Sequence, residues 1–465
     1  MNKENMDKAK YYDYMLSVLD KAENGPVIEE KEWDRQYINK EIKRLIKKYD
    51  VQWDAETMVP NDDALADRVF EAGMELATNT GIYCIDTKRQ MKWTLDELQM
   101  VIDSTPTEEV LGSGEGKVTI RPRRPDDDSP IVCVGGPYGT QVPEELYIPI
   151  MQSYAQEKII DWIDDASLIS THGRPIRAGS PWEAVACWQE AQMSKEAIRR
   201  AGRPDMPIGA AENSPSAIGE LSSCTEGGFR LTDWHHACLV SELKVPYAEL
   251  TKAMHYVHTG ASYHNFYNTI FGGYVGGGDG MAVAIVAGLV LMKACLGGMT
   301  LNPGPSHAHL SCNTFPAMIP SQSIGHQGVT RNTNLFTSAF TRPVGGPGTK
   351  DILYESAAFA VSSVVSGISV MEGTQAATGR FTAHVSGLEA RFNAEAAHAA
   401  VGMSRKKADE IVQKIVPLYA DQQHLMNKGK PFNKVYNVET VQPTAEWLGI
   451  YDEVRKEMND LGLKM

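Results

Sequence analysis

The sequence predicts an α/β protein: a (β/α)8 TIM barrel with an N-terminal helical extension and a short C-terminal extension. Short apolar or β-branched runs alternate with helical patterns over roughly 300 residues, and strand-helix units repeated so often are most simply closed into a parallel barrel. The chain has 465 residues, 42% of them hydrophobic and 22% charged, which is enough to bury a large core. A doubly wound parallel sheet is the alternative arrangement.

The first part of the chain, residues 1–108, predicts a helical extension. Tyr11, Met15 and Val18 share one helical face, and the apolar residues between Ile38 and Tyr49 recur at helical spacing. Thr94 and Glu97 form a capping-box pattern, which predicts a further helix up to about residue 103.

Residues 109–420 carry the alternation that predicts the barrel. Apolar runs predict strands at 118–120, 131–134, 206–211 and 307–313. Helical patterns predict helices at 180–200, 281–297 and 352–370. The helix at 180–200 has the strongest start signal, because Ser180-Pro181-Trp182-Glu183 combines an N-cap, a proline at the first helical position and a reciprocal glutamate.

Residues 421–465 predict a C-terminal extension that ends in a helix over 445–461. The most apolar run of the chain, 281–292, stops at Lys293 after about twelve residues, short of the roughly twenty that span a bilayer. It predicts a buried helix. Residues 1–10 lack the apolar stretch of a secretory signal and cannot work as one. We expect no membrane partner.

Charge and cysteine content narrow the classes of function. The net charge of −14, from 45 Lys and Arg against 59 Asp and Glu, would repel a phosphate backbone, which argues against nucleic-acid and anionic-membrane binding. The seven cysteines include no C-x-x-C pattern and predict neither a disulfide framework nor a zinc ribbon. We expect a reducing cytoplasm.

Two patterns suggest a cofactor or metal site, but each has a more ordinary interpretation. The glycine-rich segment 272–280 matches neither a G-x-G-x-x-G motif nor a P-loop, which favours a loop at the barrel rim. His307 and His309 lie two apart in a predicted strand, like the paired ligands of metal-dependent barrel hydrolases. Further candidate ligands are His255, His258 and His326. That architecture needs the pair on its first strand, so hydrogen-bonded histidines are favoured and no metal site is expected.

A glutamate follows one of the predicted strands. Glu212 comes directly after 206–211, and barrel enzymes place catalytic groups at the carboxyl ends of their strands. The residue types alone leave an active-site acid and a loop-capping carboxylate equally open.

Several segments resemble the monomethylamine methyltransferase family of methanogenic archaea and related bacteria, in the same order and at preserved spacing. They are Gly81-Ile82-Tyr83-Cys84-Ile85-Asp86-Thr87, Ala201-Gly202-Arg203-Pro204, Ile270-Phe271-Gly272-Gly273-Tyr274-Val275-Gly276-Gly277, Gly387-Leu388-Glu389-Ala390-Arg391 and 430–452. The resemblance implies a (β/α)8 barrel that passes a methyl group from a methylated amine to the Co(I) corrinoid of a partner protein. It also implies a homo-oligomer, a hexamer, that binds no cofactor tightly because the cognate corrinoid protein supplies the corrinoid.

This chain departs from the family pattern at three positions. The residue five after Arg203-Pro204 is pyrrolysine in the family and Gly209 here. A family glutamate is replaced by Phe266, and a family glutamine by Phe340. Glu212 matches a family active-site glutamate, so the resemblance implies a catalytic role for it.

These replacements exchange an amine-binding side chain and two polar groups for space and two aromatic faces. A quaternary ammonium binds aromatic faces by cation–π attraction, whereas methylammonium needs directed hydrogen bonds. We therefore expect Gly209, Phe266 and Phe340 to form the substrate site, together with Tyr263 and Tyr267; Tyr274 is also nearby in sequence. The alternative is that the two phenylalanines only fill the void.

The sequence thus predicts a corrinoid-dependent methyltransferase for a methylated amine that is quaternary or larger than methylamine. Two alternatives stay open: a metal-dependent TIM-barrel hydrolase, and a non-catalytic relative that binds a corrinoid protein.

Overall fold

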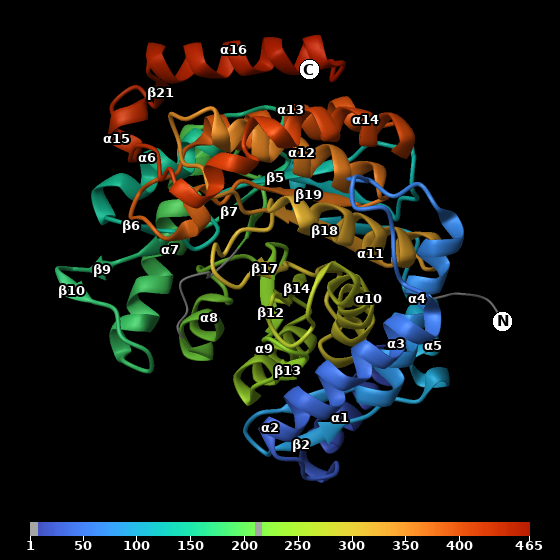
Figure 1. Ribbon diagram of the computed structural model, residues 1–465. Helices are drawn as coiled ribbons and strands as arrows, with labels where there is room; N and C mark the ends of the chain where they lie inside the picture. The colour runs from blue at the N-terminus through green and yellow to red at the C-terminus, as the bar shows by residue number, and fades with distance from the viewer. Residues whose placement is uncertain (1–7, 210–215) are drawn as a thin grey trace.

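The computed structural model, which describes residues 8–209 and 216–465, is built around an eight-stranded parallel barrel (Figure 1). Each barrel strand pairs with the next along the chain, and the last pairs with the first. A parallel bridge between Gly209 and Trp234 joins the third and fourth strands. The strands are β5 (Val132–Gly135), β7 (Trp162–Asp164), β11 (Ile208–Gly209), β12 (His235–Leu239), β14 (Tyr263–Tyr267), β16 (Thr300–Asn302), β18 (Phe336–Thr341) and β19 (Val370–Gly373). The predicted (β/α)8 barrel is confirmed.

A helix follows each barrel strand and contributes to the outer layer. These helices are α6 (Glu144–Ala155), α7 (Pro181–Arg200), α8 (Ala217–Ser223), α9 (Tyr247–Thr259), α10 (Gly278–Cys295), α11 (Ile319–Asn332), α12 (Asp351–Val365) and α13 (Gly387–Ala400). The helix predicted at 180–200 is therefore present, but its capping differs: the Ser180 side chain makes no capping bond, and Glu183 accepts a hydrogen bond from the Gly179 N–H at 2.6 Å.

The strand predicted at 307–313 is wrong, and the true barrel strand lies upstream as β16. Two prolines, Pro303 and Pro305, follow β16 and remove backbone donors, so the ladder cannot continue toward the histidines. His307 instead ends the short strand β17 (Ser306–His307), which pairs with β15 (Ile270–Phe271) outside the barrel. The helix predicted to reach residue 370 ends at Val365, and Val370 begins β19.

The N-terminal extension is helical, as predicted. It consists of α1 (Lys8–Asn24), α2 (Glu30–Glu32), a π-helical segment (Trp33–Lys40), α3 (Glu41–Tyr49), α4 (Asp63–Thr80) and α5 (Leu95–Asp103). The Thr94–Glu97 capping box is present at the start of α5. Three short strands accompany the helices: β1 (Ile82–Cys84), β2 (Arg89–Met91) and, contributed by the barrel segment, β13 (Lys244–Val245). The predicted strand at 118–120 is β4 (Val118–Ile120), which pairs with β3 (Glu109–Leu111) before the barrel begins.

Helix α10 has apolar residues on every face, and other elements of the protein pack against each of these faces. It contacts α4 and α5 of the extension as well as α11 of the barrel. Among helices in the described part of the chain, α10 alone passes a test of length and composition for crossing a membrane, and 83% of that span is buried inside the protein. The prediction of a buried helix is confirmed.

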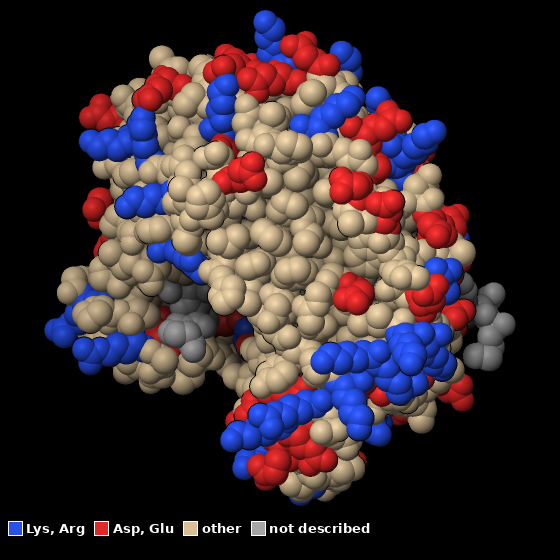
Figure 2. All heavy atoms as spheres, viewed as in Figure 1, with Lys and Arg blue, Asp and Glu red and all other residues tan. Residues whose placement is uncertain are grey.

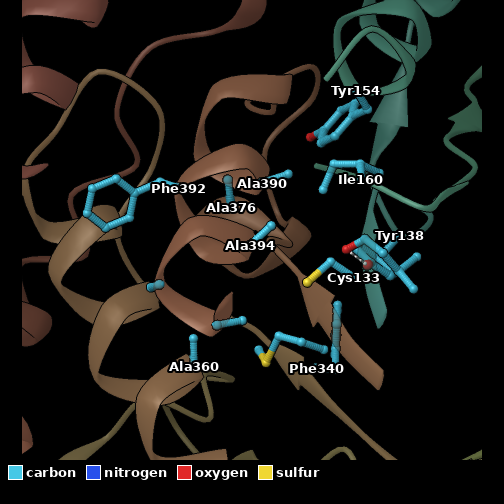
Figure 3. Close-up of a cluster of buried hydrophobic side chains, with 14 of the residues drawn as sticks. Cys133, Tyr138, Tyr154, Ile160, Phe340, Ala360, Ala376, Ala390, Phe392 and Ala394 are labelled. Atoms are coloured by element: carbon cyan, nitrogen blue, oxygen red, sulfur yellow. Dashed lines mark hydrogen bonds between the residues drawn. The ribbon is translucent and has the colours of Figure 1, made fainter. Parts of the chain in front are cut away.

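The hydrophobic interior divides into two cores. One lies around β5, β7, β18 and β19 and their helices, and the other joins α10 and β14 to the N-terminal extension. Figure 3 shows part of the first core, which includes the small side chains of Ala360 on α12 and of Ala390 and Ala394 on α13. Small residues let these two helices pack closely together.

The C-terminal extension packs on the first core. It contains α15 (Phe432–Val435) and α16 (Ala445–Leu461), and α14 (Arg405–Ile415) precedes it in the chain; the final helix has the predicted bounds. Trp447 of α16 is buried and its Nε1 donates to Ser386 Oγ at 3.3 Å, which fixes α16 beside the start of α13.

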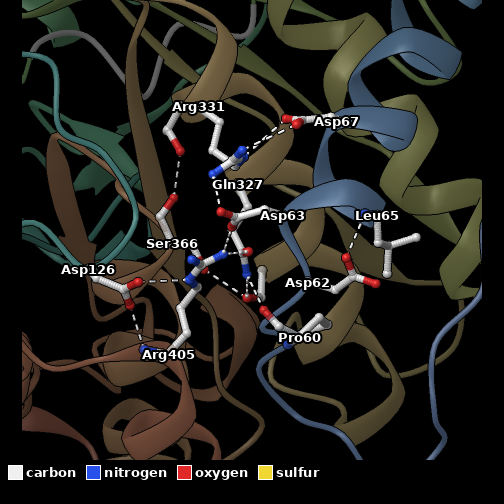
Figure 4. A network of polar contacts seen from close by, with 12 residues as sticks. Pro60, Asp62, Asp63, Leu65, Asp67, Asp126, Gln327, Arg331, Ser366 and Arg405 are labelled. Atoms are coloured by element: carbon white, nitrogen blue, oxygen red, sulfur yellow. Dashed lines mark hydrogen bonds and ion pairs between the residues drawn. The ribbon is translucent and has the colours of Figure 1, made fainter.

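A polar network joins α14 to the N-terminal extension (Figure 4). Arg405 Nη1 donates to Asp63 Oδ1 and to Gln327 Oε1, both at 2.8 Å, and its Nε donates to Asp126 Oδ2 at 3.1 Å. One mostly buried guanidinium thus connects α14, α4, α11 and the loop before the barrel. Arg331 makes a more exposed pair with the same Asp63.

The surface is mixed in charge. On the face in Figure 2, lysine and arginine side chains gather over the N-terminal helices at the lower right, while acidic side chains are scattered and the middle of the face carries few charges. The negative net charge therefore coexists with a local basic surface.

Candidate functional site

A cavity of about 130 Å³ lies inside the barrel, toward the carboxyl ends of its strands. At about 30 Å³ per molecule, this is the space of about four waters. Carboxyl ends of strands are where barrel enzymes place their active sites. Side chains from six barrel strands or the loops that follow them line the cavity: Tyr138, Asp164, His236, Cys238, His264, Phe266, Phe340, Arg342, Glu372 and Gln375.

Strand alternation decides which residues of β12 and β14 reach this cavity. In the register of the two strands, His236 is opposite His264 and Cys238 is opposite Phe266. All four line the cavity, and they are spaced by two along each strand. The inner faces of two neighbouring strands thus bring a histidine pair and a thiol–phenyl pair together.

The structure brings Phe266 and Phe340 together. Their ring centroids lie 6.2 Å apart, and the rings meet edge to face at 79°. Phe340 also packs on Tyr138, with centroids 4.6 Å apart, and the Arg342 guanidinium lies 5.3 Å from the Phe340 centroid. Both phenylalanines line the lumen; that they bind substrate stays a prediction.

The expectation that Tyr263 and Tyr267 line the same site is wrong. Both lie at odd positions of β14, on the face opposite to Phe266, and both are buried in the second core. The Tyr263 hydroxyl donates to the Leu296 carbonyl at 2.7 Å, and Tyr267 packs against Gly288 of α10. Tyr274 is 43% exposed and does not line the cavity either.

The remaining predicted site residues are Gly209 and Glu212. Gly209 is buried at the end of β11, directly opposite Asp164 in the neighbouring strand. An ideal Cβ at position 209 would lie 2.4 Å from Asp164 Oδ2. Glu212 lies outside the described residues.

Sequence reasoning missed the ionisable groups of the lumen. His236 Nε2 lies 3.5 Å from Asp164 Oδ2, and the rings of His236 and His264 are 4.2 Å apart. His264 stacks on Trp234 at 3.6 Å, and neither of its ring nitrogens has a hydrogen-bond partner among the described residues. Burial holds the pKa of His264 well below its usual value, with the neighbouring His236 adding to the effect, so His264 is neutral at pH 7.

Glu372 is the second carboxyl group of the cavity. It is fully buried on β19, and Asn302 Nδ2 donates to its Oε1 at 2.8 Å. Burial raises the pKa of Glu372 to about 7, and the negative charge of Asp164 pushes it in the same direction. This carboxyl group therefore titrates near physiological pH, as groups in functional sites often do.

The histidines that were considered as metal ligands do not converge. His255 and His258 lie on α9, His326 is buried on α11, and His307 and His309 follow β16 outside the barrel sheet. Within residues 8–209 and 216–465, no group of three or more histidine, cysteine, aspartate or glutamate side chains is placed to hold a metal ion. The hydrolase alternative thus finds no donor set in the described part.

Comparison with known proteins decides the family. The family model described as monomethylamine methyltransferase MtmB matches residues 14–463. The chain belongs to the monomethylamine methyltransferase family. It is accordingly a methyltransferase, and the resemblance found in the sequence is confirmed.

Relatives in this family match from end to end. The chain is 31% identical over 444 residues to monomethylamine methyltransferase MtmB2 of Methanosarcina acetivorans and to MtmB of Methanosarcina mazei, covering 96% of this chain and 97% of each relative. The crystal structure of the Methanosarcina barkeri monomethylamine methyltransferase superposes with a TM-score of 0.94 at 30% identity, covering 97% of this chain and 98% of that one. The crystal structure of a hydroxylamine complex of MtmB gives a TM-score of 0.95, also at 30% identity and with the same coverage.

Proposed function

We propose that this protein transfers a methyl group from a methylated amine to the Co(I) corrinoid of a partner protein, and that its amine is quaternary or larger than methylamine. The names of its relatives support the amine class. The observation that carries the finer proposal is the lumen cavity. Its volume of about 130 Å³ exceeds what methylamine, with two non-hydrogen atoms, would fill, and three aromatic rings line it.

Methyl transfer requires this chain to bind the amine and to orient one of its methyl carbons toward the corrinoid of the partner protein. In the transfer, the carbon–nitrogen bond breaks and its electron pair stays on nitrogen, while the corrinoid supplied by the partner provides the electron pair of the new bond to carbon. A quaternary ammonium leaves as a neutral tertiary amine, so no proton has to move in the same step. The aromatic rings would stabilise the positive charge before transfer and lose that attraction afterwards, which favours release of the amine.

The site residues of the proposal follow from this division of work. Phe266 and Phe340 would contact the N-methyl groups, and Gly209 would bring no side chain into the site. Glu212 would interact with the cationic end of the substrate as the catalytic carboxylate. The partner is a cognate corrinoid protein that supplies the corrinoid, and the enzyme itself is proposed to be a cytoplasmic homo-oligomer, a hexamer.

Substrate screening tests the proposal. Methylated amines, betaines and thioethers are each incubated with the enzyme and a Co(I) corrinoid protein, and corrinoid methylation is followed by its absorbance. We expect a quaternary or bulky amine to react best and methylamine to react far more slowly. Comparable rates for methylamine would reject the finer proposal. Corrinoid-protein binding without methylation by any donor would favour the non-catalytic alternative, and zinc co-purifying at one equivalent would favour the hydrolase.

Glu212→Gln gives a prediction for the proposed catalytic carboxylate. Replacing the negative charge by a neutral amide of the same shape should reduce turnover of the best donor at least about a hundredfold, within the range of a lost general acid–base or electrostatic contribution. Methylation rate and circular dichroism of the two proteins check it. Unchanged kinetics in a folded variant would reassign Glu212 to structure.

A further inference from the structure

We infer that Asp164, in addition to the Glu212 of the proposed function, binds the substrate's ammonium group, and that position 209 is a glycine because the Asp164 carboxylate occupies the space of its side chain. The inference rests on the proposed function and adds to it a specificity-determining residue, which neither the sequence patterns nor the family match pointed out.

Asp164 lies too close to position 209 for a side chain there. β7 and β11 are parallel neighbours in which Ile163 is opposite Ile208 and Asp164 is opposite Gly209. A Cβ on residue 209 would lie 2.4 Å from Asp164 Oδ2, 2.8 Å from its Cγ and 3.0 Å from its Cα. Because one of these atoms belongs to the backbone, rotating the Asp164 side chain does not relieve all the contacts. A side chain at 209 and the present position of Asp164 therefore exclude each other.

The buried carboxylate of Asp164 also favours a cation in the cavity. Asp164 is fully buried and lines the cavity together with Tyr138, Phe340 and Glu372. A negative charge at this depth attracts a cation strongly, because little water is present to screen it. Glu372 shares this role only in part, since its pKa of about 7 leaves it largely protonated at slightly acidic pH. Among the described residues that line the cavity, Asp164 is thus the carboxylate that most favours a positive ligand.

One aromatic ring of the cavity, Phe340, already faces a cation. Phe340 packs on Tyr138 and also lies beneath the Arg342 guanidinium, 5.3 Å from the ring centroid. A second cation on the same ring would be repelled by that guanidinium. Aromatic faces alone therefore give an incomplete cage, and a carboxylate on the opposite strands supplies the attraction that the cage lacks.

A second polar side chain lines the same cavity as Asp164. His264 lines the cavity, is 3% exposed, and offers two ring nitrogens that no described residue satisfies. A neutral imidazole can accept a hydrogen bond from an N–H of a secondary or tertiary ammonium, or contact N-methyl groups of a quaternary one. A ligand in the cavity would meet both an anion and a neutral polar ring, with His236 beside them, 3.5 Å from Asp164 Oδ2.

The experiment measures equilibrium binding of tetramethylammonium by calorimetry, with tert-butanol as a neutral probe of similar size. Neither measurement needs the corrinoid protein, so a failure here is separable from a failure of methyl transfer. The variants are Asp164→Asn, Gly209→Ala and the pair combined, each also made in a Glu372→Gln background so that the second carboxylate cannot compensate. Asp161→Asn is the control, because Asp161 directly precedes β7 and lies outside the cavity, where its Oδ2 accepts from the Cys133 N–H at 2.7 Å.

We expect Asp164→Asn to weaken tetramethylammonium binding at least tenfold at pH 6 and to leave tert-butanol binding within twofold. Gly209→Ala should weaken the cation by a similar factor alone and add little in the Asp164→Asn background, because both changes act on one carboxylate. Cation binding by Asp164→Asn equal to that of the parent overturns the assignment. Additive effects of the two substitutions overturn the steric coupling, and absence of tetramethylammonium binding to the unmodified protein overturns the whole inference.

Discussion

At the scale of single residues, Glu372 gives the clearest pH dependence. Burial raises its pKa from 4.5 in the unfolded chain to about 7 in the folded one, so the folded state holds an extra proton between these values. The contribution of Glu372 to the unfolding free energy is therefore most favourable below pH 4.5. It decreases as the pH rises to about 7 and is constant above that pH. Across this window the loss is about 3 kcal/mol.

Glu372→Gln removes this titration. We predict that the unfolding free energy of the variant, relative to the parent, improves by about 3 kcal/mol between pH 5 and pH 8. Urea unfolding of both proteins at the two pH values measures it. Other buried carboxyl groups with raised pKa values, such as Glu242 and Glu389, are common to both proteins and cancel in the difference. An equal pH response of the two proteins would mean that Glu372 is not perturbed.

The two phenylalanines of the lumen give a second prediction at this scale. Phe266→Leu keeps most of the apolar volume but loses the aromatic face, so it should weaken a quaternary substrate about five- to thirtyfold and a neutral analogue of the same shape less. The loss at Phe340→Leu should be smaller, because Arg342 already lies over that ring. Binding of both ligands to both variants checks this. Equal losses for charged and neutral ligands would support simple void filling.

Individual residues also show how far a sequence can locate this site. The resemblance makes the meeting of Phe266 and Phe340 predictable, because it implies that each replaces a substrate-facing position of the family. Tyr263 and Tyr267 were misplaced by ignoring the two-residue alternation of a strand, which puts them on the opposite face from Phe266. The same alternation could have indicated His264. The role of Asp164 could not be found, since it depends on the register of β7 with β11.

At the scale of secondary-structure elements, the contact between α10 and β14 is tight enough to test. A Cβ on Gly288 would lie 2.3 Å from Tyr267 Cδ1 and 2.5 Å from its Cε1, and Tyr267 is fully buried. We predict that Gly288→Ala lowers the unfolding free energy by about 1–3 kcal/mol, despite the better helix propensity of alanine.

The matched control is Gly449→Ala in α16, where a Cβ meets nothing within 4 Å. There the substitution should raise the unfolding free energy by up to about 1 kcal/mol. Chemical denaturation of the two variants beside the parent separates steric overlap from propensity. Stabilisation by both substitutions would show that β14 and α10 can move apart.

The Arg405 network connects elements from three parts of the chain and provides a further prediction. Arg405→Ala would leave Gln327 Oε1 buried without its donor and Asp126 without its guanidinium, while Asp63 keeps Arg331, so we expect a loss of about 3 kcal/mol in unfolding free energy. Arg331→Ala removes a more exposed guanidinium from the same Asp63 and should lose less than about 1 kcal/mol. Thermal denaturation of both variants compares them, and equal losses would contradict the special place of Arg405.

Elements were predicted well where local signals are strong. The helices at α7 and α16 and the capping box of α5 follow from caps and periodicity within a few residues. Barrel strands were harder, because β16 and β11 have only three and two residues, too few to show a period. The segment 307–313 looked more like a strand than β16 did, and only the pairing with β14 and β18 distinguishes them.

At the scale of the whole molecule, the closed barrel followed from the number of strand-helix units, but the dependence of one half on the N-terminal extension did not. The second core includes residues of α1, α3 and α4 together with α10 and β14. Periodicity indicates which face of each helix is apolar and not which partner covers it. The extension is therefore part of the interior that supports one side of the lumen.

The N-terminal helices that pack against α10 are also synthesised before it. During synthesis, α4 leaves the ribosome roughly 200 residues before α10, which is about 10 to 40 s at 5 to 20 residues per second. The most apolar helix of the chain thus emerges when part of its binding surface is already available. Reversing that order by circular permutation, with the extension moved behind the barrel, would leave α10 uncovered on the nascent chain and expose it to chaperones and aggregation.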